Sequence, residues 1–217
     1  MKYWSNPSIT HQSVGTALSV VDNLLSYVKE GQGKPSEKER ALFAAAVAFT
    51  YGIWETFIEQ LAIELTEHVS VEIRPEKVPE DIRRMLEKKT AWELAISPGW
   101  RALWVETVRI KAVGDDAEKF GMNTARAAQV NHLLSLAGVQ NAYENVPTNI
   151  VPDHLPKTTS VAQAIDHLVQ LRGEIVHTGK VPESLRKHQV IQWRRFAEEL
   201  ADFIDETCRK QCRNLIS

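Results

Sequence analysis

Apolar residues recur three or four positions apart over most of the chain, and the few Pro and Gly residues gather at a small number of break points. The stretches between these breaks are rich in Ala, Leu, Glu, Gln, Lys and Arg, which favour helix. No segment alternates apolar and polar residues as a strand would. The pattern therefore predicts an all-α fold.

Two long helices are predicted in the first third of the chain. One runs from about Ser8 to Glu30 and ends at the glycines of 31–33, and the other begins after Ser36 as N-cap and continues to about Val69. A helix of some thirty residues exceeds the ordinary length, which suggests an element that spans a bundle. Its expected core positions are Leu42, Phe43, Ala46, Phe49, Ile53, Phe57, Leu61 and Leu65.

The rest of the chain predicts shorter helices, a loop and two further helices. Short helices are expected over 80–89, 100–113 and from 123 or 124 to 137, and the prolines at 147, 152 and 156 predict a loop over 145–160. Ser160 should cap a helix that ends at Gly179, and a last long helix should follow Pro182 and run to about Leu215.

Arg172 interrupts the apolar stripe of the helix predicted over 160–177. At about 100° per residue, the apolar side chains of this helix share one arc of roughly 160°. Arg172 lies near the centre of that arc. A guanidinium is costly to bury unpaired, so the residue needs a partner, a cleft or an interface. The structural alternative is an ion pair with Asp166, with Glu174 or with a carboxylate on another helix.

His177 follows five residues later, in the last turn before Thr178 and Gly179. On a regular helix, the side chains of Arg172 and His177 diverge by about 140°. They can meet if the last turn is distorted, which Gly173 favours, if the arginine bends round, or if a second copy of the chain supplies a partner. By itself, the histidine also fits a structural place at a helix C-terminus.

The segment LRGEIVHTG at 171–179 resembles the HEPN superfamily, whose motif is an Arg followed after four to six residues by a His. It is most similar to the RiboL-PSP-HEPN branch, and the aromatic-rich centre of the second helix, 51–57, is also similar. The resemblance implies one HEPN-type helical bundle over 1–217, with 70–160 as a variable inserted section.

The chain departs from the family at two positions. The residue after the motif Arg is commonly Asn, Asp or His, but here it is Gly173, so Glu174 would have to take that polar role or the function would go without it. Gly179 stands where some HEPN toxins carry a modified Tyr. Arg126 and His132 also fit the motif spacing, but Arg126 lies near a predicted helix start, so the later pair is preferred.

The resemblance implies metal-independent RNA cleavage with no cofactor and no metal. Attack by a ribose 2′-hydroxyl would give a 2′,3′-cyclic phosphate, with Arg172 and His177 catalytic and with Glu174 and Thr178 supporting. Imidazole suits proton transfer near neutral pH, and a guanidinium suits a phosphoryl charge. The resemblance also implies a homodimer with a composite active site, and a toxin or antiviral-defence effector with a possible antitoxin or defence-system partner.

Composition limits where RNA could bind. With 26 Lys and Arg against 28 Asp and Glu, the chain is no broad electrostatic binder of nucleic acid or membrane. Local positive charge comes from Lys180, Arg186 and Lys187, with more basic residues along the last helix; the alternative for that helix is a solvated face paired with its own acidic residues.

The apolar runs and the cysteines of the chain indicate its cellular compartment, and two alternative functions remain open. No long apolar run and no signal-peptide core are found, so a cytoplasmic protein is expected. Cys208 and Cys212 are expected to be free, packed thiols, with a zinc pair as the alternative. The alternative functions are a non-catalytic HEPN domain that serves as a binding or dimerisation module and, more distantly, an unrelated helical scaffold.

Overall fold

A computed structural model describes residues 6–29, 33–96, 99–115 and 121–217, and its described residues form helices, turns and loops without a strand. The all-α prediction is confirmed. The α-helices are α1 (Ile9–Ser26), α2 (Glu37–Glu72), α3 (Glu80–Glu87), α4 (Ala91–Ile96), α5 (Trp100–Val113), α6 (Ala127–Leu136), α7 (Val161–Thr178) and α8 (Lys187–Ile216), with 3₁₀ turns at Pro75–Lys77 and Thr148–Ile150.

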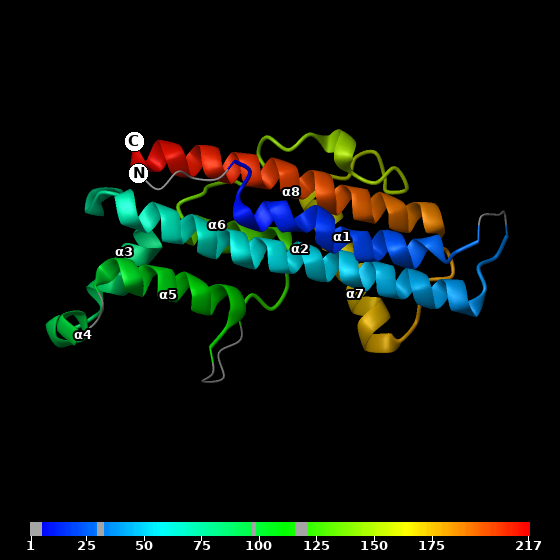
Figure 1. The fold of residues 1–217 in the computed structure, drawn as a ribbon, viewed down its shortest axis with the longest axis horizontal. Coiled ribbons are helices and arrows are strands. Elements are labelled where there is room, and N and C mark those ends of the chain that lie inside the picture. Colours follow the sequence, from blue (N-terminus) through cyan, green and yellow to red (C-terminus); the bar gives the residue numbers. More distant parts are fainter. Residues whose placement is uncertain (1–5, 30–32, 97–98, 116–120) are drawn as a thin grey trace.

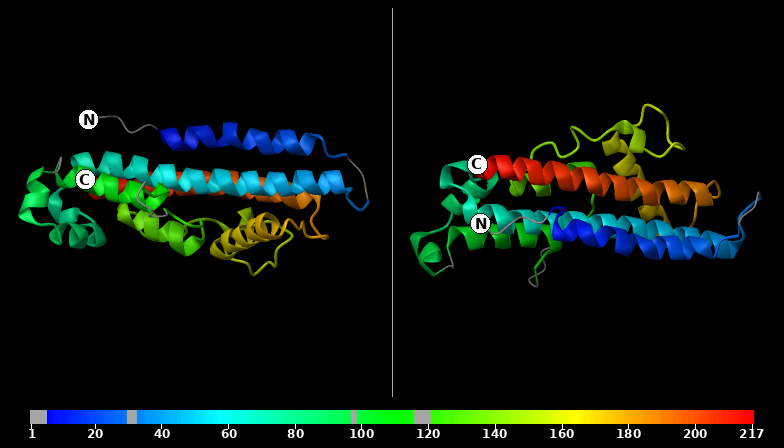
Figure 2. Two further views of the ribbon diagram at one scale, coloured as in Figure 1. Left: turned by 90° about the horizontal axis from the view of Figure 1, so that it is seen from below. Right: turned by 45° about the horizontal axis from the view of Figure 1, so that its top comes forward.

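Helix α2 is the centre of the bundle. Ser36 and Glu39 form a capping box at its start, as the sequence predicts for the N-cap. The helix contacts α1, α5, α7 and α8 along its 36 residues. α1, α2 and α8 run side by side along the long axis of the molecule, and α1 lies on one side of α2 while α6 and α7 lie on the other (Figures 1 and 2).

By length and composition alone, α2 is also apolar enough to cross a membrane. The central helix of a bundle meets the same criterion, because it is apolar around most of its circumference. Fifteen of its residues are buried against the neighbouring helices. We therefore assign α2 as a core helix of this bundle.

Three of the tryptophans anchor the core. Trp104 is fully buried, and its indole Nε1 donates to the carbonyl oxygen of Leu136 at 2.8 Å. Trp54 and Trp193 are also buried. Trp92 differs, since 73% of it is exposed on α4.

Several element boundaries differ from the sequence prediction. α1 ends at Ser26 rather than near Glu30, and Gly31 lies outside the described residues. α6 begins only after Arg126, whose backbone is extended. α8 begins at Lys187 because the segment after Pro182 packs as a loop, with Leu185 buried. The short helix α4 was not predicted, since its six residues carry no clear period.

Phe49 corrects the predicted core of α2. Seven of the eight predicted positions are buried or packed against the core, although Ile53 is only partly buried, and Phe49 is 50% exposed. Both side chains lie beside α1, which covers only part of this face of α2. An apolar surface is therefore left open on the central helix.

Candidate functional site

Helix α7 carries Arg172 and His177, and its two ends are set by local sequence. Ser160 and Gln163 form a capping box at the start. Gly179 ends the helix in the left-handed region, at φ 66° and ψ 6°, and its N–H donates to the carbonyl oxygen of Ile175 at 3.0 Å. A left-handed C-cap suits glycine, because other residues are strained there. These caps fix the position of His177 in the last turn.

The guanidinium of Arg172 lies over the ring of Tyr51 on α2, with 5.1 Å between Cζ and the ring centroid. Arg172 is half-buried, and Tyr51 is 2% exposed. A cation over an aromatic face is stabilised without using its N–H donors. The arginine is therefore held in place with donors still available to an anion.

Tyr51 is itself fixed by two hydrogen bonds. Its hydroxyl donates to Glu55 Oε1 at 2.6 Å and accepts from the backbone N–H of Ala125 at 2.9 Å. Trp54 Nε1 donates to the carbonyl oxygen of Ala125 at 3.3 Å. Burial, followed by the bond to Glu55, raises the pKa of Tyr51. Helix α2 and the residue before Arg126 thus orient the ring on which Arg172 rests.

The carboxylates that could form an ion pair with Arg172 in a purely structural role contact other groups instead. Asp166 lies 4.0 Å from Arg126 and accepts from the N–H of Ala127 at 3.4 Å. Glu174 accepts from Gln170 Nε2 at 3.1 Å. Sequence reasoning noted the aromatic centre of α2 but missed its contact with Arg172, since nothing in the pattern shows which face of α2 meets α7.

Two carboxylates extend this site along α2. Glu55 and Glu59 are four residues apart, so their side chains are neighbours on one face. Burial raises the pKa of Glu59 to about 7, and the charge of Glu55 adds to that shift. This negative stretch begins one turn from Tyr51, and sequence reasoning did not single it out.

His177 is exposed at the end of α7. The helix continues without interruption through Thr178, so the distorted last turn considered from the sequence does not occur. On such a helix the side chains of Arg172 and His177 leave the axis about 140° apart. Within one chain, the two motif residues therefore face different sides of α7.

Gly173 sits inside the regular helix, and its replacement by Ala should stabilise the protein. An added Cβ would lie 4.0 Å from His177 Cδ2, an ordinary contact. Ala is favoured over Gly in a helix by about 1 kcal/mol. Thermal unfolding of Gly173→Ala should shift upward by roughly 2–4 °C.

The matched control is Gly15→Ala in α1, which also has open space for a Cβ. It should give a similar rise in the midpoint of unfolding. A lower midpoint for Gly173→Ala alone would show that this position needs a glycine.

The supporting residues lie around the end of α7. Thr178 Oγ1 donates to the carbonyl oxygen of Glu174 and accepts from the N–H of Lys180 at 3.1 Å. Lys180 is exposed. Arg186 is the N-cap of α8, and Lys187 Nζ donates to the carbonyl oxygen of Val28 at 3.1 Å. Lys180 is thus the basic residue nearest to His177 in the chain.

Basic residues along α8 are largely engaged by acidic neighbours. Arg195 Nε lies 2.7 Å from Glu199 Oε1, and Arg194 contacts both Glu198 and Asp22. Arg209 is buried. These contacts favour the interpretation of a solvated, internally paired helix face for this part of α8.

Both cysteines are buried on α8, and neither forms a disulfide. Burial raises the pKa of Cys212 to about 12. Among residues that the structure describes, no group of three or more His, Cys, Asp or Glu side chains is placed to hold a metal ion. The zinc alternative therefore has no further ligands there.

Comparison with known proteins identifies the segment that contains the motif. Residues 113–210 match the model of the RiboL-PSP-HEPN family, and no curated protein or solved structure is significantly similar. The match begins inside the section that the sequence analysis treats as an insertion, and it includes α6, α7 and most of α8. Over this segment, which carries Arg172 and His177, the chain is similar to the RiboL-PSP-HEPN family.

Proposed function

We propose that this protein is a metal-independent RNA endonuclease with Arg172 and His177 as catalytic residues. A HEPN domain points to a role in RNA cleavage or nucleotide binding. The observation that carries the finer proposal is Arg172, held half-buried over Tyr51 on the same helix as an exposed histidine. The test is cleavage of cellular RNA in EDTA by the wild type and by Arg172→Ala/His177→Ala.

The two side chains match the two requirements of RNA cleavage. Imidazole takes the proton of the 2′-hydroxyl as its oxygen bonds to the adjacent phosphorus. The bond from phosphorus to the 5′-oxygen breaks, and that oxygen receives a proton from an imidazolium, which leaves a 2′,3′-cyclic phosphate and a 5′-hydroxyl. The guanidinium stabilises the charge that develops on the phosphoryl oxygens. DNA lacks the nucleophile and would be spared.

A second copy of the chain would complete this site. Since Arg172 and His177 diverge on α7, one chain does not present both on one face. Across a two-fold axis, each copy can contribute the residue that the other lacks, and two-fold dimers are the commonest oligomers. We propose a homodimer with a composite cleft.

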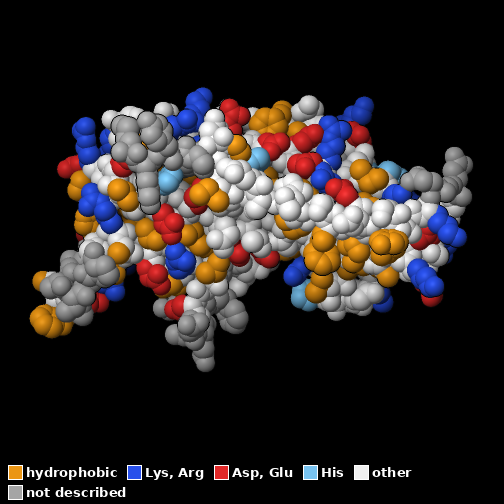
Figure 3. Space-filling model, in the orientation of Figure 1, with side chains coloured by type: hydrophobic (Ala, Val, Ile, Leu, Met, Phe, Trp, Pro, Cys, Tyr) orange, Lys and Arg blue, Asp and Glu red, His pale blue; other side chains and the backbone are white. Residues whose placement is uncertain are grey.

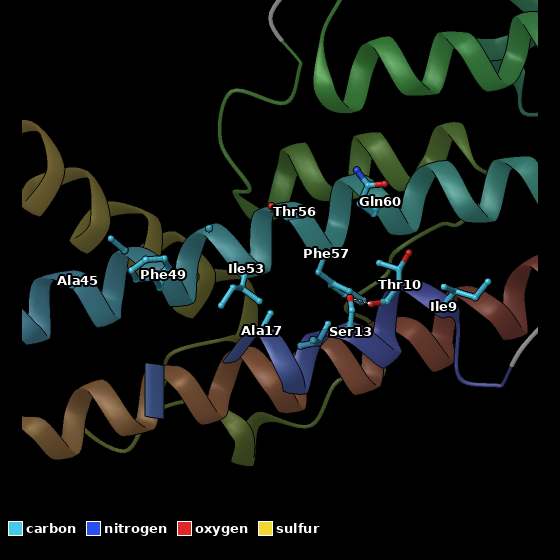
Figure 4. Close-up of a pocket in the computed structure, with 13 residues that line it drawn as sticks. Ile9, Thr10, Ser13, Ala17, Ala45, Phe49, Ile53, Thr56, Phe57 and Gln60 are labelled. Atoms are coloured by element: carbon cyan, nitrogen blue, oxygen red, sulfur yellow. Dashed lines mark hydrogen bonds between the residues drawn. The ribbon is translucent and has the colours of Figure 1, made fainter. Parts of the chain in front are cut away.

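The open apolar face of α2 is our proposed dimer surface. A groove of about 640 Å³ lies between α1 and α2, and Ile53 and Phe57 extend from α2 toward Ala17 and Ser13 of α1 (Figure 4). Hydrophobic side chains gather over this part of α2 in the space-filling view (Figure 3). Gly52 lies in the groove and directly follows Tyr51 in the chain, so the groove and the ring beneath Arg172 belong to the same stretch of α2.

The groove is also suited to pairing with itself. Phe49 is half-exposed, while its neighbours Ala45, Ala48 and Gly52 are small. A Cβ at Gly52 would meet no atom within 4 Å. In a two-fold interface, a projecting ring from each copy can therefore pack over the small residues of the other.

Phe49→Glu should convert the dimer to a monomer, since it places a charge in the proposed interface. Val71→Glu is the matched control, because Val71 is 69% exposed on the same helix but outside the groove. Light scattering at micromolar concentration should give a monomer mass for Phe49→Glu alone. A monomeric wild type, or a dimeric Phe49→Glu, would contradict the proposed surface.

The biological role follows as part of the proposal. A cytoplasmic RNA endonuclease that acts on cellular RNA would arrest growth, as a toxin or an antiviral-defence effector does, and would call for a restraining partner such as an antitoxin. Expression should arrest growth, and His177→Ala should relieve the arrest. Growth arrest by both the wild type and His177→Ala would mean that the toxicity does not depend on the proposed catalytic residue.

The second candidate function is a non-catalytic binding or dimerisation module. Gly173 favours it, because the position after the arginine lacks the polar side chain common in the family. Glu174, which could replace that side chain, is bonded to Gln170. A folded dimer that binds RNA but leaves it intact would support this function over the nuclease.

A further inference from the structure

A second cavity, of about 300 Å³, lies between α7, the loop before it and the start of α8. It is separate from the groove on α2, with which it shares no lining residue. Its volume is at the lower end of small-molecule sites, ~300–1,000 Å³. The cavity can therefore hold one small planar group.

The α7 side of this cavity leads to His177. His167, Gln170 and Glu174 line the cavity, and all three lie with His177 within about 80° on the helix. Glu174 is three residues before His177, so the two side chains are neighbours. A ligand in the cavity would lie next to the proposed proton-transfer residue.

The floor and one wall of the cavity suit a heterocyclic base. Trp193 is buried, and the His154 ring packs edge-on against it, with centroids 5.4 Å apart. His154 Nδ1 is 2.6 Å from Gln192 Oε1, and Gln192 Nε2 donates to Asp153 Oδ2 at 3.2 Å. The imidazole is thus held in one orientation. Flat, oriented rings are the surfaces on which RNA-binding proteins place unstacked bases.

The polar groups at the rim define which base fits. The carboxylate of Glu174 is oriented by Gln170 Nε2, which donates to its Oε1. Gln189 Oε1 accepts from the N–H of Arg186 at 2.9 Å, so its amide nitrogen is the end that remains to donate. On one side of the rim, the two carboxylate oxygens of Glu174 can therefore accept hydrogen bonds, and on the other side the amide nitrogen of Gln189 can donate one.

We propose that this cavity binds a guanine base of the RNA, with Glu174 as the specificity-determining residue. On its Watson–Crick edge, guanine carries two adjacent N–H donors, N1–H and the N2 amino group, beside the O6 acceptor. A carboxylate pairs with two such donors at once, and Gln189 can donate to O6. Adenine, cytosine and uracil do not present two adjacent donors there. The inference rests on the proposed nuclease function and names its substrate preference: cleavage next to an unpaired guanosine.

Binding of nucleoside 3′-monophosphates tests the cavity without any cleavage. Titration calorimetry with the full-length protein should show guanosine 3′-monophosphate binding about tenfold more tightly than the adenosine, cytidine and uridine forms, as a bidentate pair provides. Glu174→Gln should abolish the preference. Glu206→Gln, an exposed carboxylate on α8 outside the cavity, should keep it.

Mapping of cleavage sites gives the second readout. Wild-type cuts should lie next to guanosine, and the cuts that Glu174→Gln still makes, at whatever rate, should be spread over all four bases. Equal binding of the four nucleotides, no binding, or a preference that survives in Glu174→Gln would overturn the proposal. Cleavage without base preference would contradict guanine binding in the cavity but not the proposed nuclease function. Guanosine binding by a protein that leaves RNA intact would contradict the nuclease function but not guanine binding.

Discussion

Arg172→Ala/His177→Ala should lose at least about 10³-fold of the rate of RNA cleavage measured in EDTA. Removal of a general acid or base costs about 10²–10⁴-fold, and removal of a group that stabilises the transition-state charge costs a comparable factor. The losses should not multiply, because the two residues act on one transition state. Single-turnover cleavage of a labelled RNA measures the rate.

The chain provides a matched control for this experiment. Arg126 and His132 also fit the permitted motif spacing, but they belong to α6, with Arg126 as its N-cap and 4.0 Å from Asp166. The exposed pair contributes little to stability, so Arg126→Ala/His132→Ala should fold. Normal cleavage by this control, with loss in the Arg172/His177 variant, assigns the activity to α7. Equal activity in both variants would instead trace the cleavage to another site or to a contaminant.

Asp205→Ala should lower the free energy of unfolding by about 3–5 kcal/mol, the usual result of leaving one charge of a buried pair without its partner. Asp205 Oδ2 accepts from Arg209 Nε at 2.7 Å on α8, and the two side chains are 2% and 8% exposed. The other carboxylate oxygen, Oδ1, is buried without a hydrogen-bond partner. Urea unfolding monitored by circular dichroism measures the loss.

Two further variants isolate the buried charge. Asp202→Ala removes an exposed aspartate from the same helix, where it pairs with His11 at 2.6 Å, and should change stability by no more than about 1 kcal/mol. Asp205→Leu/Arg209→Met replaces both charges by apolar groups and should recover most of the lost stability. A small effect of Asp205→Ala would mean that water reaches Arg209.

Much of the fold could be predicted from periodicity and caps. α2, α5 and α7 begin and end within a few residues of their predicted limits, because Ser36, Ser160 and Gly179 act locally on their own helices. α4, the end of α1 and the start of α8 could not be placed, since these limits depend on packing between distant segments. Val28 and Leu185, for example, are buried although neither is helical.

The candidate site, like the fold, could be predicted only in part from the sequence. The helix ending, the interrupted apolar stripe and the family resemblance were visible in 171–179, and the family match covers that segment. The exposure of Phe49 could not be predicted from the sequence. α2 is apolar around most of its circumference, so the pattern does not show which side its neighbours cover. The cavity beside α7 also depends on His154 and Trp193, which are distant in sequence from Glu174.

The sequence by itself determined that the chain is helical, where α7 ends, and that an arginine and a histidine stand on different sides of that helix. These properties follow from hydrogen bonds and side-chain directions within a few residues. Only the tertiary structure decided that Arg172 rests on Tyr51, with Ala125 and Glu55 fixing the ring. That arrangement joins three segments far apart in the chain, and their meeting is set by the packing of α2 against α7, which no local pattern encodes.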